Sequence, residues 1–318
     1  MIKVEGLSKN YGLVKAIDHI SFEVEEHQNL ILLGTSGCGK TTTLKMINRL
    51  VEPSSGRILI NGIDITKEKP ETLRRKIGYV LQNYGLFPHY TVAQNIGIVP
   101  QLLNWEKQKT KSRTLELLEK LHLPADILNA YPSELSGGQQ QRIGLARALA
   151  TNPPVLLMDE PFGALDNVTK ANIHAEFLAL DELKQKTIIM VTHDVQEAFE
   201  LGDRICLMDK GEIVQDGSPS ELLLKPVNDF VAGFLKEQQL LLEFKTTKIL
   251  DLWSLLITSR QNNVEPIINA EIDLWTLIEL IKKQKSEFVN IQNHKNGEVL
   301  GLGFEAIMQA FYQYIKSK

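Results

Sequence analysis

This 318-residue sequence is poor in cysteine, in long apolar runs and in excess basic charge. Its two cysteines, Cys38 and Cys206, exclude a disulfide framework and fit a reducing compartment. The longest apolar stretches, such as residues 30–33, are far shorter than the ~20 residues that span a bilayer, and the N-terminus lacks the apolar segment of a signal peptide. The 35 basic and 39 acidic residues give a net charge of −4, which argues against nucleic acid as a partner.

The composition is that of an ordinary globular protein. Apolar residues make up 43% and charged residues 23% of the chain, which excludes a disordered, collagenous or coiled-coil protein. At ~150 residues per domain, the length predicts two domains, or one large domain with an appendage.

Short apolar runs alternate with helical patterns over the first two thirds of the chain. The expected strands are residues 29–33, 76–81, 155–158 and 187–192, and the expected helices are residues 41–50, 112–121, 138–150 and 168–184. This alternation predicts an α/β fold with a mainly parallel sheet. Residues 2–7, 20–24 and 57–60 predict a small antiparallel sheet besides.

The pattern changes near residue 240. We expect an ATPase-sized domain over residues 1–235, a polar linker over 236–248 and an accessory region over 249–318. Helical spacing after residue 274, two short β-type runs around a turn at Asn296-Gly297, and a helical face after Ile307 predict an α-β-β-α unit there.

A phosphate-binding loop is the strongest motif. Residues 34–41 read Gly-Thr-Ser-Gly-Cys-Gly-Lys-Thr and match G-x-x-x-x-G-K-[ST] between a predicted strand and a predicted helix. Glycines let backbone N–H groups turn toward phosphates, and the helix N-terminus adds a positive dipole end. Lys40 is expected to reach the β- and γ-phosphates and the Thr41 hydroxyl to bind Mg²⁺.

Two further strands end in residues suited to hydrolysis. Asp159 and Glu160 follow the apolar run 155–158, where an aspartate can hold Mg²⁺ and a glutamate can polarise an attacking water. His193 closes the run 187–192, and ligands of such sheets bind at the carboxyl ends of strands. Taken alone, a histidine at a strand end is as compatible with a structural role.

A second anion-binding helix end is predicted at residues 135–142. Ser136 is a good N-cap, and the glycines after it leave backbone N–H groups exposed. An ordinary capped helix is the alternative for this segment.

Together these residues closely resemble the ATP-binding subunit of ABC transporters, over about residues 1–235. The resemblance implies an ABC-type P-loop ATPase domain with a parallel sheet core, an antiparallel β-subdomain and a helical subdomain, which uses ATP and Mg²⁺. It identifies residues 135–139 as the family signature, Gln82 as the Q-loop glutamine and residues 163–166 as the D-loop, with Ala164 where many members carry serine.

The resemblance also assigns roles. It implies catalysis by Glu160 as general base, His193 as switch, Gln82 and Lys40, and Mg²⁺ binding by Thr41, Gln82 and Asp159. The residues implied to contact nucleotide are Tyr11 (stacked on adenine), Gly34, Thr35, Ser36, Gly37, Cys38, Gly39, Lys40, Thr41, Thr42, Ser136, Gly137, Gly138, Gln139 and Asp166.

Within that family the chain most resembles importer ATPases for osmoprotectants such as glycine betaine, carnitine or choline. Residues 45–53, 73–80, 85–89 and 228–231 carry this likeness. It implies a head-to-tail pair of these chains, membrane-embedded permease subunits, indirectly a substrate-binding protein, and a peripheral place on the cytoplasmic face of the membrane. Members often end in paired CBS modules, whereas the tail here has room for one degenerate CBS-like unit around residues 269–316. A salt-sensing role and a docking role are both open for this tail.

Three alternative classes share part of this pattern. An importer ATPase for methionine, a polyamine or another small solute would share every motif. Soluble ABC ATPases of DNA repair carry a long coiled coil between the phosphate loop and the signature, for which the segment from Lys40 to Leu135 is too short, and those of translation carry two cassettes. An inactive regulatory cassette conflicts with the presence of Lys40, Asp159, Glu160 and His193.

Overall fold

The computed structural model describes residues 2–163, 167–256, 267–284 and 288–317. The chain forms two compact units, residues 1–216 and 217–318. The division falls earlier than the boundary expected at residue 235. Asp166, expected to contact nucleotide, lies outside the described residues. Within the described residues, no helix is both long enough and apolar enough to span a bilayer.

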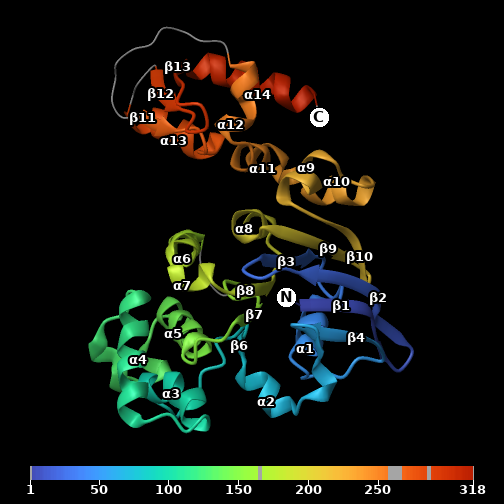
Figure 1. Ribbon diagram of the computed structural model, residues 1–318, viewed down its shortest axis with the longest axis vertical. Coiled ribbons are helices and arrows are strands. Elements are labelled where there is room, and N and C mark those ends of the chain that lie inside the picture. The colour runs from blue at the N-terminus through green and yellow to red at the C-terminus, as the bar shows by residue number, and fades with distance from the viewer. Residues whose placement is uncertain (1, 164–166, 257–266, 285–287, 318) are drawn as a thin grey trace. The chain divides into compact units, whose positions relative to one another are not determined.

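A six-stranded sheet of order β10-β9-β3-β8-β7-β6 forms the centre of the first unit (Figure 1). Its strands are β3 (Asn29–Gly34), β6 (Ile77–Val80), β7 (Val155–Asp159), β8 (Thr187–Val191), β9 (Arg204–Asp209) and β10 (Glu212–Gly217). From β9 to β6 all neighbours are parallel, which confirms the predicted sheet. β7 and β8 are buried at every residue, as their continuous apolar runs predicted.

A second, four-stranded antiparallel sheet of order β2-β1-β4-β5 confirms the predicted β-subdomain. Its strands are β1 (Ile2–Tyr11), β2 (Val14–Val24), β4 (Ser55–Ile60) and β5 (Ile63–Asp64). Helix α1 (Lys40–Ile47) contributes the fully buried Leu44, Met46 and Ile47 to one core shared with both sheets. This packing fixes the start of α1, and with it the phosphate loop.

Three helices gather beside β6 (Figure 1). They are α3 (Val92–Leu102), α4 (Lys107–Lys120) and α5 (Gly137–Leu149), which form the expected helical subdomain. The sequence predicted α4 and α5 but not α3, which contains Pro100 near its C-terminal end. α3 is nevertheless stable, because Thr91 and Gln94 form a capping box and Ile96 is fully buried.

Other parts of this unit also differ from expectation. The helix predicted over residues 168–184 is two helices, α6 (Asn167–Ala179) and α7 (Asp181–Lys184), because Leu180 between them is extended. The short elements α2 (Pro70–Arg75), α8 (Val195–Leu201), β9 and β10 were not predicted. α2 and α8 are only two turns or less, too short for periodicity to register.

The second unit has its own core. It contains α9 (Pro219–Leu224), α10 (Asp229–Leu235), α11 (Gln239–Thr246), α12 (Ile249–Leu252), β11 (Ile267–Asn269), α13 (Leu274–Gln284), β12 (Phe288–Gln292), β13 (Val299–Gly303) and α14 (Phe304–Lys316). The elements α13-β12-β13-α14 confirm the predicted α-β-β-α order. The predicted linker is mostly helical, because α11 packs on α9 and α13 and its Phe244 contacts Phe311.

Candidate functional site

The phosphate loop requires glycine at both of its ends. Gly34 has φ +151° and Gly39 φ +106°, values that favour glycine. A Cβ on Gly34 would lie 2.0 Å from the Met208 carbonyl oxygen, and one on Gly39 would lie 2.3 Å from Ile17 Cδ1. The loop is therefore clamped between β9 and β2, while Thr35, Ser36 and Gly37 are exposed at its tip.

Lys40 is held by its own loop. Its Nζ donates hydrogen bonds of 2.9 Å to the carbonyl oxygens of Gly34 and Thr35, and the residue is 5% exposed. The ammonium is thus fixed at the start of α1, beside the backbone N–H groups of the helix end. This arrangement places a positive charge and N–H donors together, as an anionic phosphate group requires.

Thr41 and Asp159 join the start of α1 to the end of β7. The Thr41 hydroxyl donates a 2.8 Å hydrogen bond to Asp159 Oδ1. Burial raises the pKa of the Asp159 carboxyl, although the Thr41 hydroxyl and the cations Lys45 and Lys40 oppose that rise. A hydroxyl and a carboxylate are the oxygen ligands that Mg²⁺ prefers, so the pair fits the predicted magnesium site.

Glu160 lies at the meeting point of three strand ends. Gln82 Nε2 donates a 2.9 Å hydrogen bond to Glu160 Oε2, and His193 Nδ1 lies 3.2 Å from the same oxygen. These residues follow β6, β7 and β8, so the carboxyl ends of three parallel strands place them together. Glu160 has φ +45°, a backbone conformation that is unusual for a residue other than glycine. Its backbone N–H donates to the Val191 carbonyl.

Ser136 and Gln139 cap the predicted helix end by two reciprocal hydrogen bonds. The Ser136 hydroxyl accepts from the Gln139 N–H at 3.3 Å, and the Gln139 side-chain oxygen accepts from the Ser136 N–H at 2.9 Å. Ser136 and Gly137 are exposed and Gly138 is half-buried. The cap occupies the N–H of Gln139, so anion binding at this end is expected from the N–H groups of Gly137 and Gly138.

Tyr11 lies at the end of β1, before the turn into β2. Its side chain is 51% exposed, and Lys9 Nζ lies 5.1 Å from its ring centroid. An exposed ring at a hairpin end has the accessibility that stacking requires. The adenine role of Tyr11 remains a prediction.

Sequence reasoning missed several residues that hold the site. Arg147 of α5 donates to the carbonyl oxygens of Gly85 and Tyr84, at 2.6 and 3.0 Å, and so fixes the segment after Gln82. Thr35 Oγ1 donates to Asp209 Oδ1 at 3.0 Å. A charged Arg147 inside the apolar run 143–150 was a usable signal, whereas Asp209 required the unpredicted β9.

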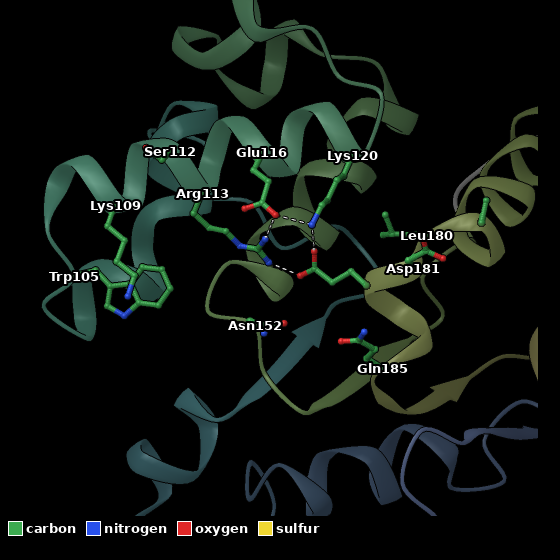
Figure 2. Close-up of a pocket in the computed structure, with 12 residues that line it drawn as sticks. Trp105, Lys109, Ser112, Arg113, Glu116, Lys120, Asn152, Leu180, Asp181 and Gln185 are labelled. Atoms are coloured by element: carbon green, nitrogen blue, oxygen red, sulfur yellow. Dashed lines mark hydrogen bonds and ion pairs between the residues drawn. The ribbon is translucent and has the colours of Figure 1, made fainter.

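A separate cleft of about 790 Å³ is lined by α4, α7 and the segment near Asn152 (Figure 2). It contains none of the predicted site residues. Its central charges pair with one another: Glu182 accepts from Arg113 and from Lys120, the latter at 3.0 Å, and Arg113 also donates to the Leu149 carbonyl at 2.9 Å. This network ties α4 to α7, so we assign it a structural role.

Comparison with known proteins finds relatives that are transport ATP-binding proteins. The family model described as "ABC transporter" matches residues 17–163. The chain is 45% identical over 297 residues to the glycine betaine/carnitine/choline transport ATP-binding protein of Bacillus subtilis, covering 93% of this chain and 76% of that protein. It is 51% identical to the osmoprotectant import ATP-binding protein of Salmonella typhimurium, covering 76% of this chain and 65% of that protein. The chain thus spans about two thirds to three quarters of these relatives.

Solved structures agree with the sequence relatives. A dimeric ATP-binding cassette in a post-hydrolysis state, bound to ADP and phosphate, is 33% identical with a TM-score of 0.62, covering 69% of this chain and 98% of that one. A Clostridium perfringens protein that is part of an ABC transporter complex has a TM-score of 0.64 at 28% identity, covering 76% of this chain and 98% of that one. The chain has the phosphate loop and the strand-end carboxylates, and it is similar to these relatives over most of its length. The protein therefore belongs to the family of ABC transporter ATP-binding proteins.

Proposed function

We propose that this chain is the ATP-hydrolysing subunit of an ABC importer for an osmoprotectant such as glycine betaine, carnitine or choline. The observation that carries the hydrolytic part is the position of Glu160, whose carboxylate oxygen contacts both Gln82 and His193 beside the Thr41–Asp159 pair. The proposed substrate class is based on relatives that are named for these solutes.

Each group has a defined task in this mechanism. The loop N–H groups and Lys40 bind the phosphates of ATP. Glu160 accepts a proton from the attacking water, and the contact from Gln82 aims its carboxylate. His193 adjoins the same carboxylate and, from its strand end, contacts the terminal phosphate. Thr41 and Asp159 would hold Mg²⁺, which when bound neutralises phosphate charge.

The same proposal includes the partners. Two copies pair head to tail, so that the exposed end at Ser136 of one copy completes the nucleotide site of the other. Cycles of ATP binding and hydrolysis close and open this pair and drive a separate permease, on which the chain sits at the cytoplasmic face of the membrane. A substrate-binding protein delivers the solute, which never contacts this chain.

Uptake in cells tests the assignment. A strain lacking this gene, complemented with the wild-type chain, is expected to accumulate labelled glycine betaine in high salt, and complementation with Glu160→Gln is expected to give none. Excess unlabelled carnitine or choline should compete, and methionine or a polyamine should not. Competition by methionine or a polyamine alone would show that the chain serves an importer of the alternative class.

A further inference from the structure

His174 of α6 is a buried histidine between two carboxylates. Its side chain is only 7% exposed, its Nδ1 lies 3.0 Å from Glu200 Oε2, and its Nε2 lies 3.3 Å from Glu197 Oε1. Both partners belong to α8, so this single ring fastens α6 to α8.

The contacts of this ring favour its protonated form. Ionised carboxylates only accept hydrogen bonds, so each ring nitrogen that contacts one must carry a proton. A neutral imidazole has one N–H and would turn a lone pair toward one carboxylate. The two contacts therefore favour the imidazolium form of His174 over the neutral ring. Burial lowers its pKa, but Glu197 and Glu200 outweigh burial and raise the pKa above its usual value.

The charges around His174 come from two helices. Among the side chains that the structure describes, Glu197 and Glu200 face it from α8, and Lys170 lies one turn earlier on its own helix. Lys170 Nζ is 3.8 Å from Glu197 Oε1 and 2.5 Å from Asp194 Oδ2. Two cations of α6 thus meet three carboxylates of α8 and its cap.

This cluster adjoins the segments that follow β7 and β8, which carry Glu160 and His193. The Phe162 ring, two residues after Glu160, packs edge-on against the His174 ring with centroids 4.7 Å apart. Asp194, the residue after His193, caps α8 by accepting from the Glu197 N–H at 3.2 Å. α8 has only seven residues and cannot be stable by itself, so its start depends on packing and on these ion pairs.

We propose that His174 and Lys170 are positioning residues that hold His193 beside Glu160 through the start of α8. This inference rests on the proposed ATP hydrolysis. While His174 is an imidazolium, both carboxylates of α8 stay paired. As pH rises through its raised pKa, the ring loses one proton, one carboxylate loses its donor, and α8 loosens. Turnover then falls on the alkaline side, while ATP binding at the phosphate loop is unaffected.

Three variants test this with the full-length chain. His174→Gln removes the charge, and we expect kcat for ATP hydrolysis to fall about tenfold at pH 7 while the KM for ATP stays within about twofold. His174→Arg supplies a cation with several N–H donors at every pH. It is expected to restore kcat at pH 7 and to flatten the alkaline fall in kcat. Glu176→Gln, which breaks the 2.8 Å ion pair of α6 with Arg142 instead, is the matched control and should leave kcat and the pH profile unchanged.

The outcomes separate the inference from the proposed function. A wild-type chain that does not hydrolyse ATP would contradict the proposed function itself. If the wild type hydrolyses ATP and His174→Gln matches it, the positioning role is wrong. Loss of ATP binding together with kcat in His174→Gln, without rescue by His174→Arg, would reduce His174 to a structural residue. An alkaline fall unchanged in His174→Arg would also overturn the inference.

Discussion

The Thr41 hydroxyl donates a 2.8 Å hydrogen bond to Asp159 Oδ1, which links the first turn of α1 to the end of β7. Asp159 is 5% exposed, and burial raises the pKa of its carboxyl. Burial of an ionised carboxylate costs free energy of folding. Such a cost is expected for a group that binds a cation rather than stabilising the fold.

Replacing Asp159 should therefore improve stability and abolish activity. A folded-state pKa above the unfolded value means that the folded chain loses stability as pH rises through these two values. Asp159→Asn removes the charge and keeps an oxygen to accept from Thr41, so we expect a gain of about 1 kcal/mol, or ~2 °C in Tm, at pH 7. Magnesium-dependent ATP hydrolysis should be lost.

Thermal denaturation at two pH values checks the cause. The stability gain of Asp159→Asn should shrink as pH is lowered toward the range where the wild-type carboxyl is protonated. A variant that is less stable than wild type at pH 7 would show that the carboxylate supports the fold and contradict this reading.

Glu160→Gln should separate binding from hydrolysis. The amide keeps the shape of the side chain but cannot accept a proton from water, so turnover should fall by about 100-fold or more. Lys40 and Thr41 are untouched, so ATP should still bind and dimers with trapped ATP should accumulate on size-exclusion chromatography. Lys40→Ala is the contrasting variant, in which binding itself weakens. Turnover of Glu160→Gln near that of wild type would exclude Glu160 as the base.

The parts of the site that the sequence predicted are those set by local pattern. The glycine spacing around Lys40 and the apolar runs ending at Asp159 and His193 each specify a strand end, and parallel pairing then brings those ends together. Arg147 and Asp209 were missed because their roles depend on long-range contacts, with the segment after Gln82 and with Thr35. The break at Leu180 was missed because helical spacing continues across it.

The ion-pair network beside the cleft predicts a large effect on stability. Glu182 has a side chain only 9% exposed and accepts from both Arg113 and Lys120. Glu182→Ala leaves a largely buried guanidinium without this partner, and we expect a loss of about 2–3 kcal/mol. Asp181→Ala, which removes the exposed pair with Lys184, is the control and should change stability by less than about 0.5 kcal/mol. Equal effects in urea denaturation of the two variants would contradict the importance of burial here.

The part of the second unit after Gln238 should be dispensable for basal hydrolysis. The Thr41–Asp159 contact and the Gln82–Glu160 contact both lie within residues 1–216. A chain ending at Gln238 loses α11 and the core built on α13, and its ATPase rate should stay within about threefold of the full chain. If the tail senses salt, the truncated transporter should also lose its dependence on ionic strength. An unchanged salt response would assign the tail to docking or structure, and loss of basal activity would show that it supports the first unit.

Sharing of the nucleotide site between two chains can be tested by mixing two inactive variants. Ser136 and Gly137 are exposed, so the start of α5 is accessible to a second copy. Lys40→Ala disables the phosphate loop. Gly138→Asp places a carboxylate where a phosphate of the partner chain should bind, while an acidic residue in the first turn of α5 suits the helix itself.

Each variant alone forms dimers in which both sites are defective. In a mixed head-to-tail dimer, one site combines both defects, and the other combines an intact Lys40 with an intact Gly138. The mixture should therefore trap one nucleotide per mixed dimer, measured after purification through two different affinity tags. If each site were built within one chain, every site would keep one defect and mixing would recover no trapping. Verified mixed dimers without trapped nucleotide would thus contradict the shared site, and with it the closing of the pair as the driving step of transport.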